Sequence, residues 1–171
     1  YEDQTEALRK LGIEYQALAQ HRSALDQHEM HLHMAEKAKD IAGQGCASRN
    51  AGVSYIALKQ HKKAVKLIAF AHKVAKELED EAGEALACLE FGNACMMAED
   101  FPKAAEHYEY AFDMCQKPEN SDSLGMRHAE KACVGAGKAH FRSQNYIESV
   151  KWFGDHLQIA QSIGDEKMIA S

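Results

Sequence analysis

The sequence predicts an all-α fold, an α-α superhelix of four stacked helical hairpins, and three observations lead to this prediction. Glycines recur in one register at spacings of 40, 40 and 45 residues, at Gly12, Gly52, Gly92 and Gly137. A small residue follows each glycine by 12 positions, at Ala24, Ala64, Ala104 and Ser149. Apolar or small residues also stand at the helical spacings i, i+3 and i+7 around each glycine. Self-similarity at a fixed period indicates a repeat architecture.

The recurring glycines indicate where the two helices of each hairpin meet. A glycine inside a helix costs roughly 1 kcal/mol relative to alanine. Four glycines at one phase therefore predict four places where helices pack closely, with the small residues on the opposite helix. We expect first helices near residues 5–18, 43–58, 82–98 and 125–143. We expect second helices near residues 21–39, 61–79, 101–116 and 146–163.

The turns within the hairpins are predicted at polar residues, namely Gln20, Gln60, Asp100 and Asn145. Asp100 and Asn145 are also residue types that favour the N-cap of a helix. The second helices are expected to run on to Asp40, Asp80, Asp122 and Asp165. The segment 117–122 contains Pro, Asn and Ser and predicts a longer surface loop.

The whole chain, residues 1–171, is expected to form one domain. Its repeats are placed at about residues 5–44, 45–84, 85–129 and 130–169. The chain opens inside a repeat without a methionine, and Asp165-Glu166-Lys167 echoes Asp80-Glu81-Ala82. We therefore expect a segment of a longer protein, with a fifth repeat beginning at the end.

Composition excludes several classes of function. The 171 residues are 46% hydrophobic and 27% charged, which is ordinary for a globular protein. A net charge of −6 gives no basic footprint for nucleic acid. No apolar run approaches the roughly 18–20 residues of a membrane span, so no membrane insertion is expected. The five cysteines include no CxxC motif. They predict reduced, buried thiols in a cytoplasmic protein.

A catalytic or metal-binding function finds little support. The sequence contains no GxSxG, P-loop or HExxH motif, so we expect no enzyme, no catalytic residues and no cofactor. His28 and His31 are three residues apart and share a helical face, which admits a metal site. However, His28 stands in the register of Ile68, Tyr108 and Phe153, which favours a packed histidine and no metal.

The repeat units match a known motif. The first carries Leu8, Leu11, Gly12, Tyr15, Ala24 and His28, and the third carries Cys88, Phe91, Gly92, Cys95, Ala104 and Tyr108. These spacings resemble the tetratricopeptide repeat (TPR), W-x2-L-G-x2-Y followed by A-x3-F. The 40-residue period resembles the long TPRs of LGN/Pins spindle-orientation adaptors, of rapsyn-like and kinesin-light-chain-like proteins, and of bacterial peptide-sensing regulators. Phe91-Gly92-Asn93-Ala94 is similar to the L-G-N-A run of the LGN group.

The resemblance implies that first helices line a concave groove that binds a peptide. The groove residues by register are Arg9, Arg49, Asn93, Met96, Met97, Lys131, Lys138, Phe141 and Arg142. Lys131, Lys138 and Arg142 lie on one helix and suit an acidic peptide, although a solvated helix face explains them as well. Met96 and Met97 suit either an adaptable binding surface or helix packing. Some TPRs bind chaperone C-termini through a two-carboxylate clamp, and Arg9 and Arg49 match one of the basic positions that this clamp requires.

These observations predict a non-enzymatic scaffold or adaptor that binds a partner peptide in the groove. One alternative is a structural TPR segment in a larger cytoskeletal or ciliary assembly, where outer surfaces make the contacts. A second alternative is a regulator that senses a short peptide. Under each alternative the partner is a protein or peptide.

Overall fold

A computed structural model describes residues 2–117 and 123–169, and all eight elements in these ranges are α-helices. They are α1 (Glu2–Ala17), α2 (His21–Ala38), α3 (Ile41–Ala57), α4 (His61–Glu77), α5 (Glu81–Met97), α6 (Phe101–Cys115), α7 (Ser123–Arg142) and α8 (Tyr146–Ile169). No strand occurs in the described ranges, which confirms the all-α prediction. Most of the loop predicted at 117–122 lies outside the described residues. None of the described helices is both long enough and apolar enough to cross a membrane.

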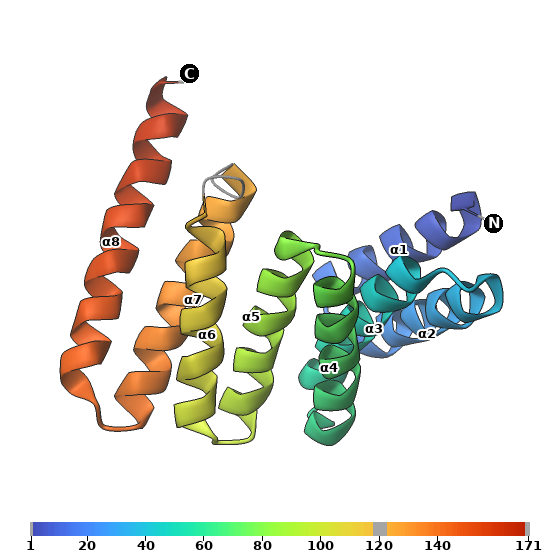
Figure 1. The fold of residues 1–171 in the computed structure, drawn as a ribbon, viewed down its shortest axis with the longest axis horizontal. Coiled ribbons are helices and arrows are strands. Elements are labelled where there is room, and N and C mark those ends of the chain that lie inside the picture. The colour runs from blue at the N-terminus through green and yellow to red at the C-terminus, as the bar shows by residue number, and fades with distance from the viewer. Residues whose placement is uncertain (1, 118–122, 170–171) are drawn as a thin grey trace. The chain divides into compact units, whose positions relative to one another are not determined.

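The chain divides into two compact units, Tyr1–Glu90 and Phe91–Ser171, and the division falls within α5. In the first unit α1 packs on α2, α2 on α3 and α3 on α4. The first helices α1 and α3 also touch, and Gln16 of α1 donates hydrogen bonds to the Asn50 carbonyl and the Ser54 hydroxyl, each at 3.0 Å. In the second unit α6 packs on α7 and α7 on α8 (Figure 1).

Six turns between consecutive helices share one backbone geometry. In each turn a residue adopts a left-handed conformation with φ between 54° and 63°, and these residues are Ala19, Lys39, Lys59, Glu79, Glu99 and Gln144. The next N–H donates to a carbonyl five residues back, as from Gln20 to Tyr15 at 2.8 Å and from Asp80 to Ala75 at 2.9 Å. This closing bond satisfies a carbonyl that the helix end would leave unpaired. The same turn therefore serves within hairpins and between them.

Asp40 and Asp80 begin helices, so the expectation that the second helices run on to these residues is wrong. The Asp40 carboxylate accepts a hydrogen bond from the Gly43 N–H at 2.8 Å, and Asp80 accepts one from Gly83 at 2.9 Å. Each aspartate thus caps the helix that follows it. A Cβ at either glycine would meet the capping carboxylate, so a larger residue there would require the aspartate side chain to shift.

Asp100 does not act as the predicted side-chain cap. It lies at the N-cap position of α6, but its side chain makes no cap hydrogen bond. Instead the carboxylate pairs with the Lys103 ammonium at 2.8 Å. The ammonium of Lys103 lowers the pKa of Asp100 below its usual value.

The register glycines are the points of closest approach, as the sequence predicts. A Cβ added at Gly52 would lie 2.7 Å from Ile68, and one at Gly92 would lie 2.6 Å from the Tyr108 ring. Gly12 meets the His28 ring in the same way, and Gly137 meets the Phe153 ring at 2.9 Å. The small residues that follow are buried, at Ala24, Ala64, Ala104 and Ser149. The Ser149 hydroxyl donates to the Gly137 carbonyl at 2.9 Å, so this buried hydroxyl, at a position where the other repeats have alanine, has a hydrogen-bond partner.

His28 is a packed core residue, as its register predicts. Its side chain is fully buried, and neither ring nitrogen has a hydrogen-bond partner within the described part of the chain. Burial, with the positive charges of His31 and Arg49 nearby, lowers the pKa of His28 to about 4. His31 is also buried, and burial lowers its pKa as well. The core therefore holds His28 in its neutral form.

The cysteines are free thiols, and the prediction that all are buried holds for three of them. Cys88, Cys115 and Cys133 are buried, whereas Cys46 and Cys95 are half-buried. Burial raises the pKa of Cys88 and Cys133 to about 12. These thiols act as small apolar residues in the packing.

Replacing His28 with the isoleucine of the next repeat should remove an acid-sensitive element. The unfolded chain binds a proton at His28 below about pH 6.5, and the folded chain does so only below about 4. Between these values unfolding takes up a proton, so acid favours unfolding. In guanidinium titrations, the stability advantage of His28→Ile over wild type should grow by roughly 3 kcal/mol from pH 7 to pH 4. The matched control is His33→Gln at an exposed site, and a pH-independent advantage for His28→Ile would contradict the prediction.

Gly92→Ala should destabilise the second unit. The Tyr108 ring lies between Gly92 and Gly135, where an added Cβ would sit 2.6 and 2.5 Å away, so the ring has no room to move. Overpacking of about 1–3 kcal/mol should exceed the helix-propensity gain of about 1 kcal/mol. Denaturant unfolding should show a net loss of about 1–2 kcal/mol. Gly154→Ala is the control, since nothing lies within 4 Å of its Cβ. That variant should be more stable than wild type, and equal effects at both glycines would refute the explanation.

Candidate interaction site

A pocket of about 370 Å³ lies in the second unit. Its lining comes from three helices: Met96 of α5, Lys138, Phe141 and Arg142 of α7, and Phe153 of α8. The volume falls within the roughly 300–1,000 Å³ that is usual for ligand sites. The sequence predicted four of these five residues as groove residues, and the structure brings those four together.

Local helix geometry explains the lining from α7. Lys138, Phe141 and Arg142 are spaced by three and four residues, so they share one face of the helix. Because Gly137, the register glycine of α7, has no Cβ, the Phe153 ring lies directly against the helix backbone. Phe153 therefore forms one wall of the pocket beside the α7 side chains.

Apolar surface is open at this pocket. Phe141 is 57% exposed and Phe153 is 39% exposed, although both are large hydrophobic residues. The Phe141 ring meets the Tyr146 ring edge-on, with 5.6 Å between their centroids. By contrast, Tyr108, in the register of Phe153, is only 4% exposed. The pocket thus presents aromatic surface at a position whose counterpart in the preceding hairpin, Tyr108, is buried.

Two cations stand at the same pocket. The Arg142 guanidinium lies 4.5 Å from the centroid of the Phe101 ring, and this cation–π contact favours its observed position. Within the described residues neither Lys138 nor Arg142 forms an ion pair with a carboxylate. Lys131 is exposed on α7 but does not line the pocket. The charges of Lys138 and Arg142 are therefore available to an anionic group.

The remaining predicted groove residues are separate from this pocket. Arg9 makes a two-pronged ion pair with Glu6, with both N–O distances 2.7 Å, and this contact lowers the pKa of Glu6 to about 2. The Asn93 side-chain oxygen accepts a hydrogen bond from the Tyr108 hydroxyl at 2.7 Å. Met97 is exposed but outside the lining, and Arg49 lines a different pocket in the first unit.

Phe153 is the pocket residue that sequence reasoning missed. The repeat pattern assigns it to the buried A-x3-F slot, the slot of Ile68 and Tyr108. A signal was present in α8, where Ile147, Val150 and Leu157 add further large apolar residues at helical spacing. The structure leaves these side chains 83%, 73% and 59% exposed.

The chemistry of the pocket suits binding. Its lining offers a thioether, two aromatic rings and two cations. In the described ranges no group of three or more His, Cys, Asp or Glu side chains is arranged to hold a metal ion. A partner that combines an apolar side chain with a carboxylate would match both parts of the lining.

The fold is similar to that of solved helical-repeat proteins. BtubC (BKLC) from P. vanneervenii matches with a TM-score of 0.80 at 13% identity, over 94% of this chain and 64% of that chain. The apo form of RapI matches with a TM-score of 0.82 at 15% identity, over 98% of this chain and 60% of that chain. The chain thus spans less than two thirds of either protein. No protein-family model and no curated protein sequence matches it. At such identities the likeness shows the fold alone, and it confirms the α-α superhelix.

Proposed function

We propose that this chain is a non-enzymatic, cytoplasmic scaffold of the long TPR type that binds an acidic segment of a partner protein. The observation that carries the proposal is the convergence of Lys138, Arg142, Phe141 and Met96 on one pocket with an exposed aromatic wall. The partner would place an apolar side chain against Phe141 and Phe153, and a neighbouring carboxylate at Arg142 and Lys138.

The two parts of the lining contribute differently. Buried apolar area stabilises a complex by roughly 25 cal/mol per Å², so the aromatic wall would supply most of the affinity. A guanidinium binds a carboxylate through two parallel hydrogen bonds, and the stacked position of Arg142 reduces the entropy lost on binding. The cations therefore supply orientation and selectivity for acidic sequences.

A peptide-sensing regulator is the second candidate. It needs the same kind of pocket, one that accepts a short peptide with apolar and acidic groups. The structural role in a cytoskeletal or ciliary assembly rests on the resemblance seen in the sequence. It predicts that outer faces, rather than the pocket of Lys138 and Arg142, make the partner contacts.

Charge reversal at the pocket should weaken acidic ligands selectively. The probe is a fluorescent acidic peptide with one central phenylalanine, measured by anisotropy. The double variant Lys138→Glu and Arg142→Glu should bind it at least tenfold more weakly, because attraction becomes repulsion. The variant also loses the Arg142–Phe101 contact, worth about 0.5–1 kcal/mol at an exposed site.

Two controls separate charge from packing. Phe101→Leu removes the same stacking contact and keeps both cations, so it should weaken binding of the acidic peptide by no more than about fivefold. Lys131→Glu reverses a charge on the same helix away from the pocket and should have a small effect. If all three variants bind equally, the pocket is not the site.

A further inference from the structure

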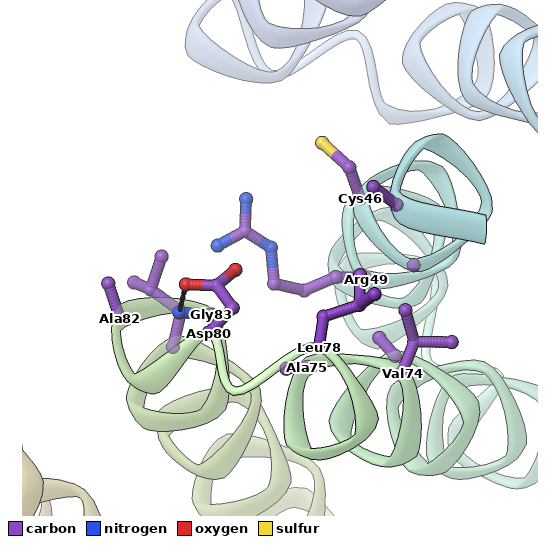
Figure 2. Close-up of a pocket in the computed structure, with 12 residues that line it drawn as sticks. Cys46, Arg49, Val74, Ala75, Leu78, Asp80, Ala82 and Gly83 are labelled. Carbon is purple, nitrogen blue, oxygen red and sulfur yellow. Dashed lines mark hydrogen bonds between the residues drawn. The ribbon is translucent and has the colours of Figure 1, made fainter. Parts of the chain in front are cut away.

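A second pocket, of about 240 Å³, lies in the first unit between α3, the end of α4 and the start of α5. One wall is apolar and includes Ala71, Val74 and Leu78 of α4. Two charged residues, Arg49 and Asp80, also line it. Figure 2 shows the Arg49 guanidinium reaching from α3 across the pocket toward the start of α5, where Asp80 and Gly83 lie.

The charge of Arg49 differs from that of its counterpart one repeat earlier. Arg9 stands 40 positions before Arg49 and is neutralised by Glu6, three residues upstream. Cys46 stands at the corresponding place before Arg49. Arg49 forms no ion pair within the described residues, and its guanidinium donates a 3.3 Å hydrogen bond to the Asn50 side chain. The second repeat thus has a cation in a pocket where the first repeat has a closed ion pair.

The pocket itself also follows from the difference between these repeats. His31 and Thr5 are buried in the first hairpin. Forty positions later the second hairpin has Ala71 and Gly45. Both of these smaller residues line the pocket. Ala71 therefore leaves open space that the His31 ring occupies one repeat earlier, whereas Gly45 lets the Val74 side chain lie against the α3 backbone.

Asp80 supplies a negative charge to the same pocket. One carboxylate oxygen accepts the Gly83 hydrogen bond at 2.9 Å that caps α5. No ion pair joins Asp80 to Arg49, so these opposite charges face one space without neutralising each other. A plain anion would meet the carboxylate of Asp80, and a plain cation would meet Arg49. A molecule with both charges matches both residues.

We propose that this pocket binds a free aliphatic α-amino acid. Its carboxylate would pair with Arg49, its ammonium with the second oxygen of Asp80, and its side chain would pack on Val74 and Leu78. The volume is slightly below the roughly 300 Å³ at which sites for drug-sized ligands begin, which suits a single amino acid. This site lies in the other unit from the pocket of Lys138 and Arg142 and does not depend on the function proposed there.

The test is a titration of the 171-residue chain with L-leucine, followed by methyl NMR of Val74 and Leu78 and by calorimetry. Leucine should shift these resonances. The analogues 4-methylpentanoate and 3-methylbutylamine, which each lack one charge, should bind at least tenfold more weakly.

Matched variants separate binding from folding. Arg49→Met should reduce leucine affinity at least tenfold, while Arg9→Met, its counterpart in the first repeat, should leave it unchanged. Asp80→Asn should weaken binding although asparagine caps helices as well as aspartate does, and Asp40→Asn is its control. Cys46→Glu restores the Glu6–Arg9 arrangement and should abolish binding by neutralising Arg49. Unchanged far-UV circular dichroism and melting temperature would verify the fold of each variant.

Three results would overturn the proposal. The first is the absence of any shift at Val74 and Leu78 with millimolar leucine. The second is equal affinity of wild type and Arg49→Met. The third is tight binding of a peptide that ends in leucine together with no binding of free leucine, which would assign the pocket to a chain terminus instead.

Discussion

The fold depends on one repeated contact, in which a side chain of the second helix lies directly on a glycine of the first. The residue is always 16 positions after the glycine: His28 after Gly12, Ile68 after Gly52, Tyr108 after Gly92 and Phe153 after Gly137. Because any Cβ would occupy that space, the glycine determines how closely the two helices approach. The turn then needs only one left-handed residue, and the same turn recurs in six places. The outward faces of the helices are free of this constraint.

The contact restricts the shape of the side chain that packs on the glycine but not its chemical type. Ile68 fills the slot with an apolar side chain, and Tyr108 adds a hydrogen bond to Asn93. His28 fills it with a ring whose nitrogens have no partner in the described structure, which makes the first hairpin sensitive to acid. Phe153 fills it and stays partly exposed, so there the same slot becomes a wall of the candidate interaction site. One structural position thus belongs to the buried core in some hairpins and lines the candidate interaction site in another.

Most of the fold was predictable because the register glycines recur at a nearly constant period along the whole sequence. The caps at Asp40 and Asp80 were not predicted, because an aspartate between two helices fits the end of one as well as the start of the next, and both proved to be starts. Four lining residues of the pocket in the second unit followed from helix register. Phe153 did not, since its pattern is that of a core residue. The pocket around Arg49 was missed because it depends on the small side chain of Ala71 and on the missing carboxylate at Cys46, and both are ordinary helix residues.

The contrast between Arg9 and Arg49 indicates how such a repeat could acquire the proposed amino-acid site without losing its fold. Exposed ion pairs contribute little to stability. Cys46 in place of a glutamate therefore leaves the hairpin intact, and Arg49 then lacks the carboxylate partner that Arg9 has in Glu6. Ala71 in place of His31 removes packing, but neither Gly52 nor Ile68 lines the pocket that results. The glycine contact continues to determine the approach of α3 and α4. Sites that lie beside that contact are therefore free to diverge from repeat to repeat, and sites within it are not.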